Sequence, residues 1–381
     1  MIDRRRFLVA AAAGIFGPAH AGNGFALAGN GLAHPLGGDA DTLAIGAAWR
    51  GPAEGDAHQV GVLEVDWSAL AMRVKHAVPV PSRPHGLLPE ADGALLAVAL
   101  RPGRWLMRID RTGRMVMQVP PDDAGRTSFG GHVVASRDGR WLYTTETHGA
   151  DRRGRIGVRD ARTLCKVDEW LTHGVEPHQL LVDADRHVLV ANGGIHRDAD
   201  DRKRDLDRMD SSLVQIDGRN GELIGQWRLP DPRLSIRHMA FSNPIDGAAS
   251  RLGLALQAEH DDPGRRNEAP SLAIWSGAAL TLPARQAAAS GYAGDIAAAA
   301  DGGFVISNAF THRAWLWQPQ QPDALTEVVR LQRAYALAPW HAGGVIVAAA
   351  RGIGRWHPTD PPAMVPWPAP MALDNHCVTW V

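Results

Sequence analysis

The sequence predicts an all-β protein, a seven-bladed β-propeller built from four-stranded blades. One segment pattern recurs seven times: a key residue, a short apolar strand, a polar or glycine-containing turn, and a second apolar strand. Successive key residues lie 40 to 60 residues apart, close to the roughly 40–50 residues of a propeller blade. No segment of useful length between these strands has helical periodicity, which argues against a parallel α/β fold.

The recurring segment can be followed in order along the chain. Its first three copies are RPHGLLPEADGALLAVAL at 83–100, GGHVVASRDGRWLYTTE at 130–146 and EPHQLLVDADRHVLVANGG at 176–194. The later copies cover 236–259, 293–310, 333–352 and, as a single strand, 374–381. The key residues of the seven copies are His85, His132, His178, His238, Asp295, Tyr335 and His376.

Two further strands follow in each repeat. In the first repeat they are expected at 104–113 and 114–121, with a tight glycine turn between them, and in the second at 155–164 and 165–172. Continuous apolar runs are expected in the strands because both faces of a blade pack on neighbouring blades. Four strands in each repeat are typical of a propeller.

The two ends of the propeller are predicted to close the ring together. The segments 42–51, 58–67 and 72–81 read as three strands that lack an innermost partner, and 374–381 is a strand without a blade. Joining them completes a seventh blade and removes the exposed edges of an open sheet. The prediction is therefore one propeller domain over residues 41–381.

The first residues read as a targeting segment. Arg4 and Arg5 precede an apolar stretch and small residues, a pattern that resembles the twin-arginine export signal. We expect a leader at 1–28, a linker at 29–40 and a mature protein in the periplasm. A membrane anchor is the alternative, but the apolar run is shorter than the roughly 20 residues that span a bilayer.

Composition excludes several classes of partner. The formal net charge of −1 gives the protein no excess of positive charge with which to bind nucleic acid or anionic lipid. We also expect a monomer, with no membrane span after the leader is cleaved. The two cysteines, Cys165 and Cys377, fall on an outer and an innermost strand. They are expected to be free buried thiols with no disulfide.

Histidine at five of the seven key positions is the main functional signal. The first strand of each propeller blade lines the central channel, so these side chains are expected to ring one channel mouth. The second strand returns to the same face, and its end also carries histidine or carboxylate in several repeats. The predicted metal ligands are His85, His132, His178, His238 and His376, with Glu146, His148, Glu259 and His260 near them.

Imidazole and carboxylate together suit iron, copper, zinc or nickel. A mixed set with open positions is typical of non-haem Fe(II), whereas the general affinity order favours copper, so the identity of the metal stays open. A structural ring of hydrogen bonds and an anionic-ligand or catalytic site are the alternatives. For an anionic ligand, or a small chelate of the metal, the predicted binding residues are Arg83, Arg101, Arg237 and Arg351.

The chain also resembles a known family. The RDGRWLYTT turn is similar to repeats of lactonase-like and surface-layer propellers. The basic start, the HGLL and EPHQLLV segments and the histidine-headed repeats resemble a bacterial seven-bladed propeller family of unknown function. That resemblance implies a Tat-exported protein encoded near imelysin-type periplasmic proteins and di-haem oxidoreductases, with an accessory role in iron acquisition.

The predicted function is therefore binding of a transition metal, with iron favoured by the resemblance. The competing hypotheses are a metal-dependent lactonase-like hydrolase or metal oxidase, and a protein-interaction scaffold that uses the charged insertions 196–212 and 260–270. Solvated loops are the simpler interpretation of those insertions. The sequence contains no G-x-S-x-G elbow, phosphate-binding GxxxxGK or C-x-x-C-H haem motif.

Overall fold

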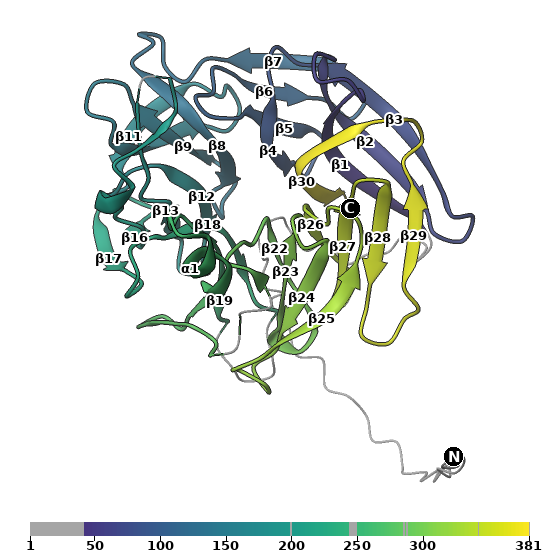
Figure 1. Ribbon diagram of the computed structural model, residues 1–381. Helices are drawn as coiled ribbons and strands as arrows, with labels where there is room; N and C mark the ends of the chain where they lie inside the picture. The colour runs from purple at the N-terminus through teal and green to yellow at the C-terminus, as the bar shows by residue number, and fades with distance from the viewer. Residues whose placement is uncertain are drawn as a thin grey trace, which may run out of the picture.

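The computed structural model describes residues 42–198, 200–243, 250–284, 286, 289–341 and 343–380. It is a ring of seven four-stranded antiparallel sheets, the seven-bladed propeller that the sequence predicts (Figure 1). The predicted leader at 1–28 and linker at 29–40 lie outside the described residues. None of the described helices is long and apolar enough to cross a membrane.

The blades follow one another along the chain. Blade 1 contains β4 (Pro84–Pro89), β5 (Leu95–Ala99), β6 (Leu106–Ile109) and β7 (Met115–Val119). Blade 2 contains β8 (Thr127–Ala135), β9 (Trp141–His148), β10 (Gly154–Asp160) and β11 (Lys166–Leu171). Blade 3 contains β12 (Pro177–Val182), β13 (His187–Asn192), β16 (Ser212–Asp217) and β17 (Leu223–Trp227).

The later blades repeat the order. Blade 4 contains β18 (Leu234–Phe241), β19 (Leu252–Ala258), β20 (Leu272–Trp275) and β21 (Leu280–Thr281). Blade 5 contains β22 (Ile296–Ala298), β23 (Phe304–Asn308), β24 (Arg313–Trp317) and β25 (Leu325–Arg330). Blade 6 contains β26 (Leu337–Trp340), β27 (Gly344–Ala349), β28 (Gly352–Trp356) and β29 (Ala363–Pro366).

Blade 7 closes the ring as predicted. The C-terminal strand β30 (Ala372–Trp380) pairs with β1 (Thr42–Arg50), which continues to β2 (His58–Asp66) and β3 (Ala71–Pro79). In Figure 1 the yellow β30 lies beside the purple β1. The pairing joins the two ends of the described chain in one sheet, so that neither end leaves an open edge on the inner side of the ring.

The core lies between the blades. Leu189 on β13 and Leu254 on β19 are fully buried in one cluster that spans blades 3 and 4. Both faces of each sheet are covered in this way, which explains why the strands read as continuous apolar runs. The first strands form the inner ring, because β4, β8, β12, β18, β22, β26 and β30 contact one another in that order around the channel.

A β-bulge marks every inner strand that carries a channel histidine. The pairing register shifts between Pro84 and Leu87 on β4, between Phe129 and Val133 on β8, between Pro177 and Leu180 on β12, and between Ile236 and Met239 on β18. On β30 it shifts between Leu373 and Cys377. A bulge turns a side chain away from the regular alternation of the strand. The irregular backbone at the bulges therefore sets the direction of the histidine side chains, which is toward the channel.

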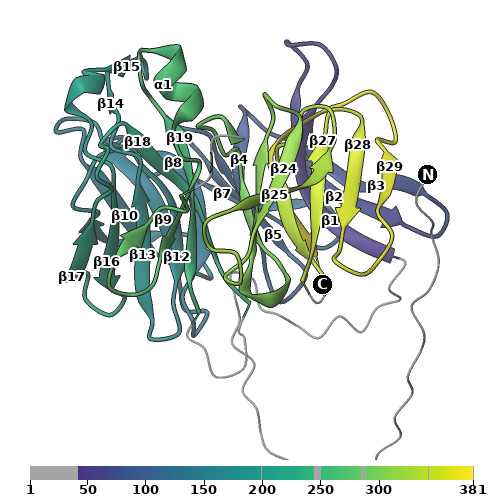
Figure 2. The same cartoon turned by 60° about the horizontal axis from the view of Figure 1, so that its bottom comes forward.

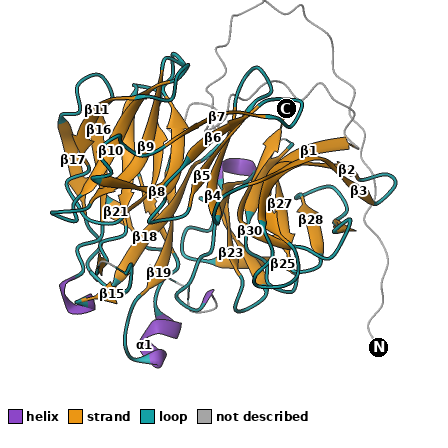
Figure 3. Cartoon of the chain, turned by 90° about the horizontal axis from the view of Figure 1, so that it is seen from above, coloured by secondary structure: helices purple, strands orange, loops and turns teal. Residues whose placement is uncertain are grey.

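Two insertions rise from one face of the ring. The hairpin of β14 (His196–Arg197) and β15 (Lys203–Arg204) follows β13, and α1 (Pro263–Glu268) follows β19. Asp262 caps α1 by accepting a hydrogen bond from the Arg265 backbone N–H. Figures 2 and 3 show β15 and α1 on the same side of the molecule. Both insertions follow second strands, as the sequence predicts.

The expectation for the cysteines is half right. Both are free, and Cys377 on β30 is buried. Cys165, however, is exposed, which corrects the prediction of two buried thiols. It lies in the turn before the outermost strand of blade 2, where the outer face of the ring meets solvent.

Candidate metal centre

Five histidines from five blades converge inside the channel. His85, His132, His178, His238 and His376 are only 2 to 8% exposed, and the ring centroids of their contacting pairs are 4.5 to 6.3 Å apart. The predicted ring of histidines is therefore a compact buried cluster in which the imidazoles contact one another. It does not line an open rim.

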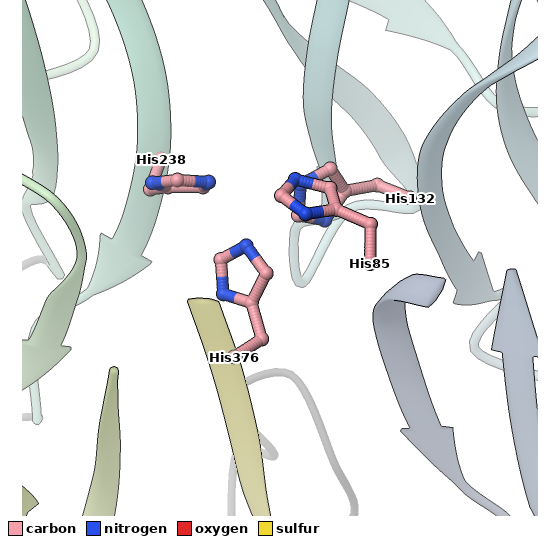
Figure 4. A group of neighbouring side chains, drawn as sticks. All are labelled: His85, His132, His238 and His376. Carbon is pink, nitrogen blue, oxygen red and sulfur yellow. The ribbon is translucent and has the colours of Figure 1, made fainter. Parts of the chain in front are cut away.

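Four of the five can offer nitrogen atoms to one point. His85, His132, His238 and His376, here the four-histidine group, each provide a ring nitrogen within 4.8 Å of the others (Figure 4). A transition metal bonds imidazole nitrogen at about 2.0–2.1 Å, so the nitrogens of a tetrahedral site are roughly 3.4 Å apart. The group would therefore contract around an ion to bring all four nitrogens to coordination distance.

The nitrogens of this group have few hydrogen-bond partners. Among the described residues, neither nitrogen of His85 has a partner, and the same holds for His132 Nε2, His238 Nδ1 and His376 Nε2. Leaving a buried polar atom unsatisfied costs about 1–3 kcal/mol. A structural ring of hydrogen bonds, one of the alternatives from the sequence, does not account for these atoms. An ion would account for one nitrogen of each imidazole, because each ring offers one lone pair.

Burial keeps the imidazoles in the form that binds metals. Desolvation lowers the pKa of His85, His132, His178 and His238 well below the usual value, and neighbouring cationic groups lower it further. The neutral imidazole has a free lone pair, whereas the imidazolium does not. These four imidazoles therefore need no deprotonation to act as ligands at neutral pH.

Asp295, which precedes β22 of blade 5, contacts the cluster. Its Oδ2 accepts a hydrogen bond from the backbone N–H of Leu337 (2.9 Å) and lies 3.5 Å from Nδ1 of His376. A carboxylate behind a histidine commonly orients the ring and raises its basicity as a metal ligand. The key position of blade 5 thus holds a residue that positions a candidate ligand.

His178 is the fifth member and links the cluster to a guanidinium group. Its Nε2 lies 2.8 Å from Nε2 of His238, so one of these two nitrogens donates a hydrogen bond to the other. Its Nδ1 lies 3.5 Å from Nη1 of Arg101. His178 therefore touches both the four-histidine group and the charged groups beside it.

Two glycines leave room for the imidazoles. Gly131 has φ +115°, and a Cβ atom there would meet Cδ2 of His85 at 2.7 Å. At Gly86 a Cβ atom would meet the carbonyl oxygen of Gly131 at 2.5 Å and Cα of His132 at 3.1 Å. Both positions are in or next to bulges, so the close approach of blades 1 and 2 depends on glycine.

The residues predicted from the second-strand ends do not join the four-histidine group. Glu146 is fully buried between Arg159 Nη2 and Lys166 Nζ, each 2.7 Å from one of its oxygens. His148 lies 3.4 Å from Asp151. Side chains alternate along a strand, and Glu146 points into its own blade, toward Arg159 and Lys166.

Glu259 and His260 are also outside the group. Both oxygens of Glu259 lie 2.6 Å from Nζ of Lys203 on the β14–β15 hairpin. His260 Nε2 lies 2.8 Å from a carboxylate oxygen of Asp231. Each residue therefore has a charged partner outside the four-histidine group. The group that the structure brings together consists of imidazoles alone.

The four predicted arginines separate into three environments. Arg101 and Arg237 lie beside the histidines and share the carboxylate of Glu176. Arg83 instead forms a two-bonded ion pair with Asp374, with distances of 2.7 and 3.0 Å, which joins blade 1 to β30. Arg351 is exposed after β27.

Sequence reasoning missed Glu176 and Arg197, which accompany Arg101 and Arg237. A signal for Glu176 was present, because the position two residues before the key residue is charged in four of the seven repeats. Those residues are Arg83, Glu176, Arg333 and Asp374. Arg197 gave no comparable signal, since it belongs to an insertion that has no counterpart in the other repeats.

A family model spans most of the propeller. It is that of DUF1513, proteins of unknown function, and it matches residues 78–380. The chain belongs to the DUF1513 family. This agrees with the resemblance to an uncharacterised propeller family that the sequence indicated. No curated protein sequence matches this DUF1513 protein.

Solved structures with the same fold have little sequence in common with this DUF1513 protein. Virginiamycin B lyase from Staphylococcus aureus is 14% identical, with a TM-score of 0.53 over 75% of this chain and 85% of the lyase. A putative 6-phosphogluconolactonase from Bacteroides fragilis is 13% identical, with a TM-score of 0.54 over 90% and 98%. Kuenenia stuttgartiensis hydrazine synthase is 14% identical, with a TM-score of 0.56 over 84% and 94%. At this identity the likeness shows the fold alone.

Proposed function

We propose that this DUF1513 protein binds one transition-metal ion through His85, His132, His238 and His376. The observation that carries the proposal is the convergence of four buried imidazoles from four blades, with unpartnered nitrogens on each. Without a bound ion this arrangement destabilises the folded state, because each buried polar atom that lacks a hydrogen-bond partner costs free energy. Coordination to an ion would satisfy one nitrogen of each of the four imidazoles.

The donor set bears on which metal is bound. Imidazole suits zinc, copper, iron and nickel, and a site with only nitrogen donors follows the general order in which copper binds most tightly. The carboxylates that favoured Fe(II) in the sequence are absent from the four-histidine group of the described chain. Iron remains the proposed ion on the strength of the family resemblance alone, with copper as its competitor.

The proposed setting is the periplasm. The twin-arginine-like start of the sequence supports export, and the resemblance supports an accessory role in iron acquisition, in which the propeller holds a metal or its chelate for other periplasmic proteins. A closed ring with a buried site suits retention of an ion more than rapid turnover. The proposal is therefore a binding protein.

The deciding experiment is the metal content of protein purified from the periplasm without chelators, measured by mass spectrometry. Wild type is compared with His132→Gln/His238→Gln, which keeps polar side chains of similar size but removes two imidazoles. We expect about one ion per chain in the wild type and less than a tenth of that in the variant. Circular dichroism and thermal unfolding show whether the variant remains folded.

The matched control is His148→Gln/His260→Gln. These histidines lie at the ends of the second strands β9 and β19, and their partners are Asp151 and Asp231. The control variant should keep its metal. A wild-type protein that carries no metal, and takes up none when iron, copper, zinc or nickel is offered, would contradict the proposal.

A further inference from the structure

A second buried polar group lies directly beside the histidines. The arginine–glutamate cluster consists of Arg101, Arg197, Arg237 and Glu176. Glu176 comes two residues before His178 and has a φ of +54°, a left-handed conformation that a non-glycine residue rarely adopts. Strained backbone of this kind persists where the surroundings hold the residue in place, often at ligand sites. The position of the Glu176 carboxylate is therefore tightly determined.

All three guanidinium groups approach the same oxygen of Glu176. Its Oε1 accepts hydrogen bonds from Nε of Arg197 (2.7 Å) and from Nη1 of Arg237 (3.1 Å), and Nη2 of Arg101 lies 3.4 Å from the same oxygen. The other oxygen, Oε2, has no hydrogen-bond partner among the described residues, and neither does Nε of Arg101 or Nε of Arg237. The side chains of Arg237 and Glu176 are only 3 and 4% exposed. Buried donors are thus left over after the internal pairing.

Charge in this region is unbalanced in the positive sense. Glu176 is the one carboxylate within 3.5 Å of these guanidinium groups in the described chain. Asp201 lies 3.7 Å from both Arg101 and Arg197, and Glu259 lies 3.8 Å from Arg237 but is held by Lys203. Burial lowers the pKa of Arg101 to about 10; Arg237 and Arg197 add to the shift, while Glu176 opposes it. An added anion would relieve this excess.

The cluster is electrostatically connected to the proposed metal site. Arg101 contacts His178, and Arg237 is the chain neighbour of His238. A divalent cation held by neutral imidazoles next to these guanidinium groups would be repelled by them. An anion that lies between the two sites would be attracted to both. A negatively charged ligand would therefore offset the repulsion between the bound cation and the arginine–glutamate cluster.

The β14–β15 hairpin builds one side of this region. It supplies Arg197 and Asp201 to the cluster and Lys203 to Glu259. Figure 2 shows the hairpin projecting beside β18, the strand that carries His238. This part of the insertion 196–212 is thus a structural component of the cluster, although the sequence favoured a simple solvated loop.

We propose that the arginine–glutamate cluster binds the carboxylate of a small polycarboxylate whose other oxygen atoms complete the coordination of the metal. The guanidinium fork matches a carboxylate in shape and charge, and the unpartnered Nε–H groups of Arg101 and Arg237 are the donors available for it. The inference rests on the proposed metal function. It assigns the bound species as a metal–carboxylate complex rather than the bare ion.

The probe is citrate, titrated by calorimetry into the full-length mature protein with and without its metal. Arg101→Gln should weaken citrate binding at least tenfold, because it removes a charged donor from a buried site. The same change should leave binding of the bare ion, added as its chloride, as tight or tighter, since a repelling charge is lost. Arg101→Lys keeps the positive charge but loses the forked geometry of the guanidinium group. Its affinity for citrate should lie between that of the wild type and that of Arg101→Gln.

The matched control is Arg351→Gln, which removes an exposed arginine at the corresponding strand end of blade 6. It should leave citrate affinity unchanged. Inorganic phosphate, titrated in parallel, tests whether the site takes any oxyanion; binding equal to that of citrate would overturn the assignment to a polycarboxylate.

The two proposals fail in different ways. If metal binds to the wild type but citrate does not, or if both Arg101 variants bind citrate as the wild type does, the polycarboxylate proposal is wrong and the metal proposal stands. If citrate binds in an Arg101-dependent manner but no metal is taken up, the metal proposal fails and the bridging role fails with it. Thermal unfolding of each variant shows whether a loss of binding reflects a loss of fold.

Discussion

Five inner strands of the propeller carry a histidine and a bulge, and the other two carry neither. On β4, β8, β12, β18 and β30 the pairing register shifts at the histidine. On β22 and β26 the pairing is regular, and the key residues Asp295 and Tyr335 come just before the strand begins. The difference indicates that the bulge, together with the residue type, directs a side chain into the channel.

The bulges are stabilised by polar side chains of neighbouring strands. Thr145 Oγ1 accepts a hydrogen bond from the backbone N–H of His132 (3.2 Å) and donates one to the carbonyl oxygen of His178 (3.3 Å). Gln179 Oε1 accepts from the backbone N–H of Met239. Backbone groups that the bulges remove from the ladder are thereby satisfied. These hydrogen bonds connect the irregular strands β8 and β12 through β9, and β12 directly to β18.

The largest expected effect is on the stability of the metal-free protein in acid. Burial lowers the pKa of His85, His132, His178 and His238, so below pH 6.5 the unfolded chain binds protons that the folded chain does not. Each of these histidines then lowers the free energy of unfolding by about 1.4 kcal/mol for every pH unit below 6.5. The four together should reduce the free energy of unfolding by about 5 kcal/mol between pH 7.5 and 5.5.

Urea unfolding of metal-free protein, followed by tryptophan fluorescence at the two pH values, measures this change. His132→Gln should reduce the pH dependence by about a quarter, because one of the four buried imidazoles is gone. A free energy of unfolding that is the same at both pH values would show that the imidazoles are not held neutral by burial.

A smaller effect is expected from filling the space at one bulge. Gly131→Ala places a Cβ atom 2.7 Å from His85 at a φ of +115° and should destabilise the protein by about 3 kcal/mol, from strain and overpacking. The control is Gly139→Ala, which has a φ of +68° but nothing within 4 Å of the added atom, and should cost about 1 kcal/mol. Equal losses in the two variants would mean that the close approach at His85 is unimportant.

The smallest effect is expected in the regular blades. Asp295→Asn removes the negative charge 3.5 Å from Nδ1 of His376 and should weaken metal binding about tenfold without changing the fold. Tyr335→Phe, at the key position of the other regular blade, is the control and should leave the affinity unchanged. Competition with a chromogenic chelator gives both affinities. An unchanged affinity in Asp295→Asn would show that Asp295 does not act on the site.

Local pattern determined the architecture and the identity of the cluster. The number of blades, the closure by 374–381 and the five histidines follow from a repeat that can be read directly in the chain, because each blade is a local unit of consecutive strands. Residues in the same register of a closed ring must approach one another at its centre. For that reason the sequence alone groups the five histidines.

Tertiary structure decided which polar residues reach the centre and which do not. Glu146 lies two residues before His148 in the sequence, yet the direction of its side chain depends on Arg159 and Lys166 across the blade. The depth of the histidines depends on bulges that no residue pattern marks. Arg197 joins Glu176 only because an insertion folds back over the ring. These features arise from contacts between distant segments, and a repeat read along one chain contains no information about them.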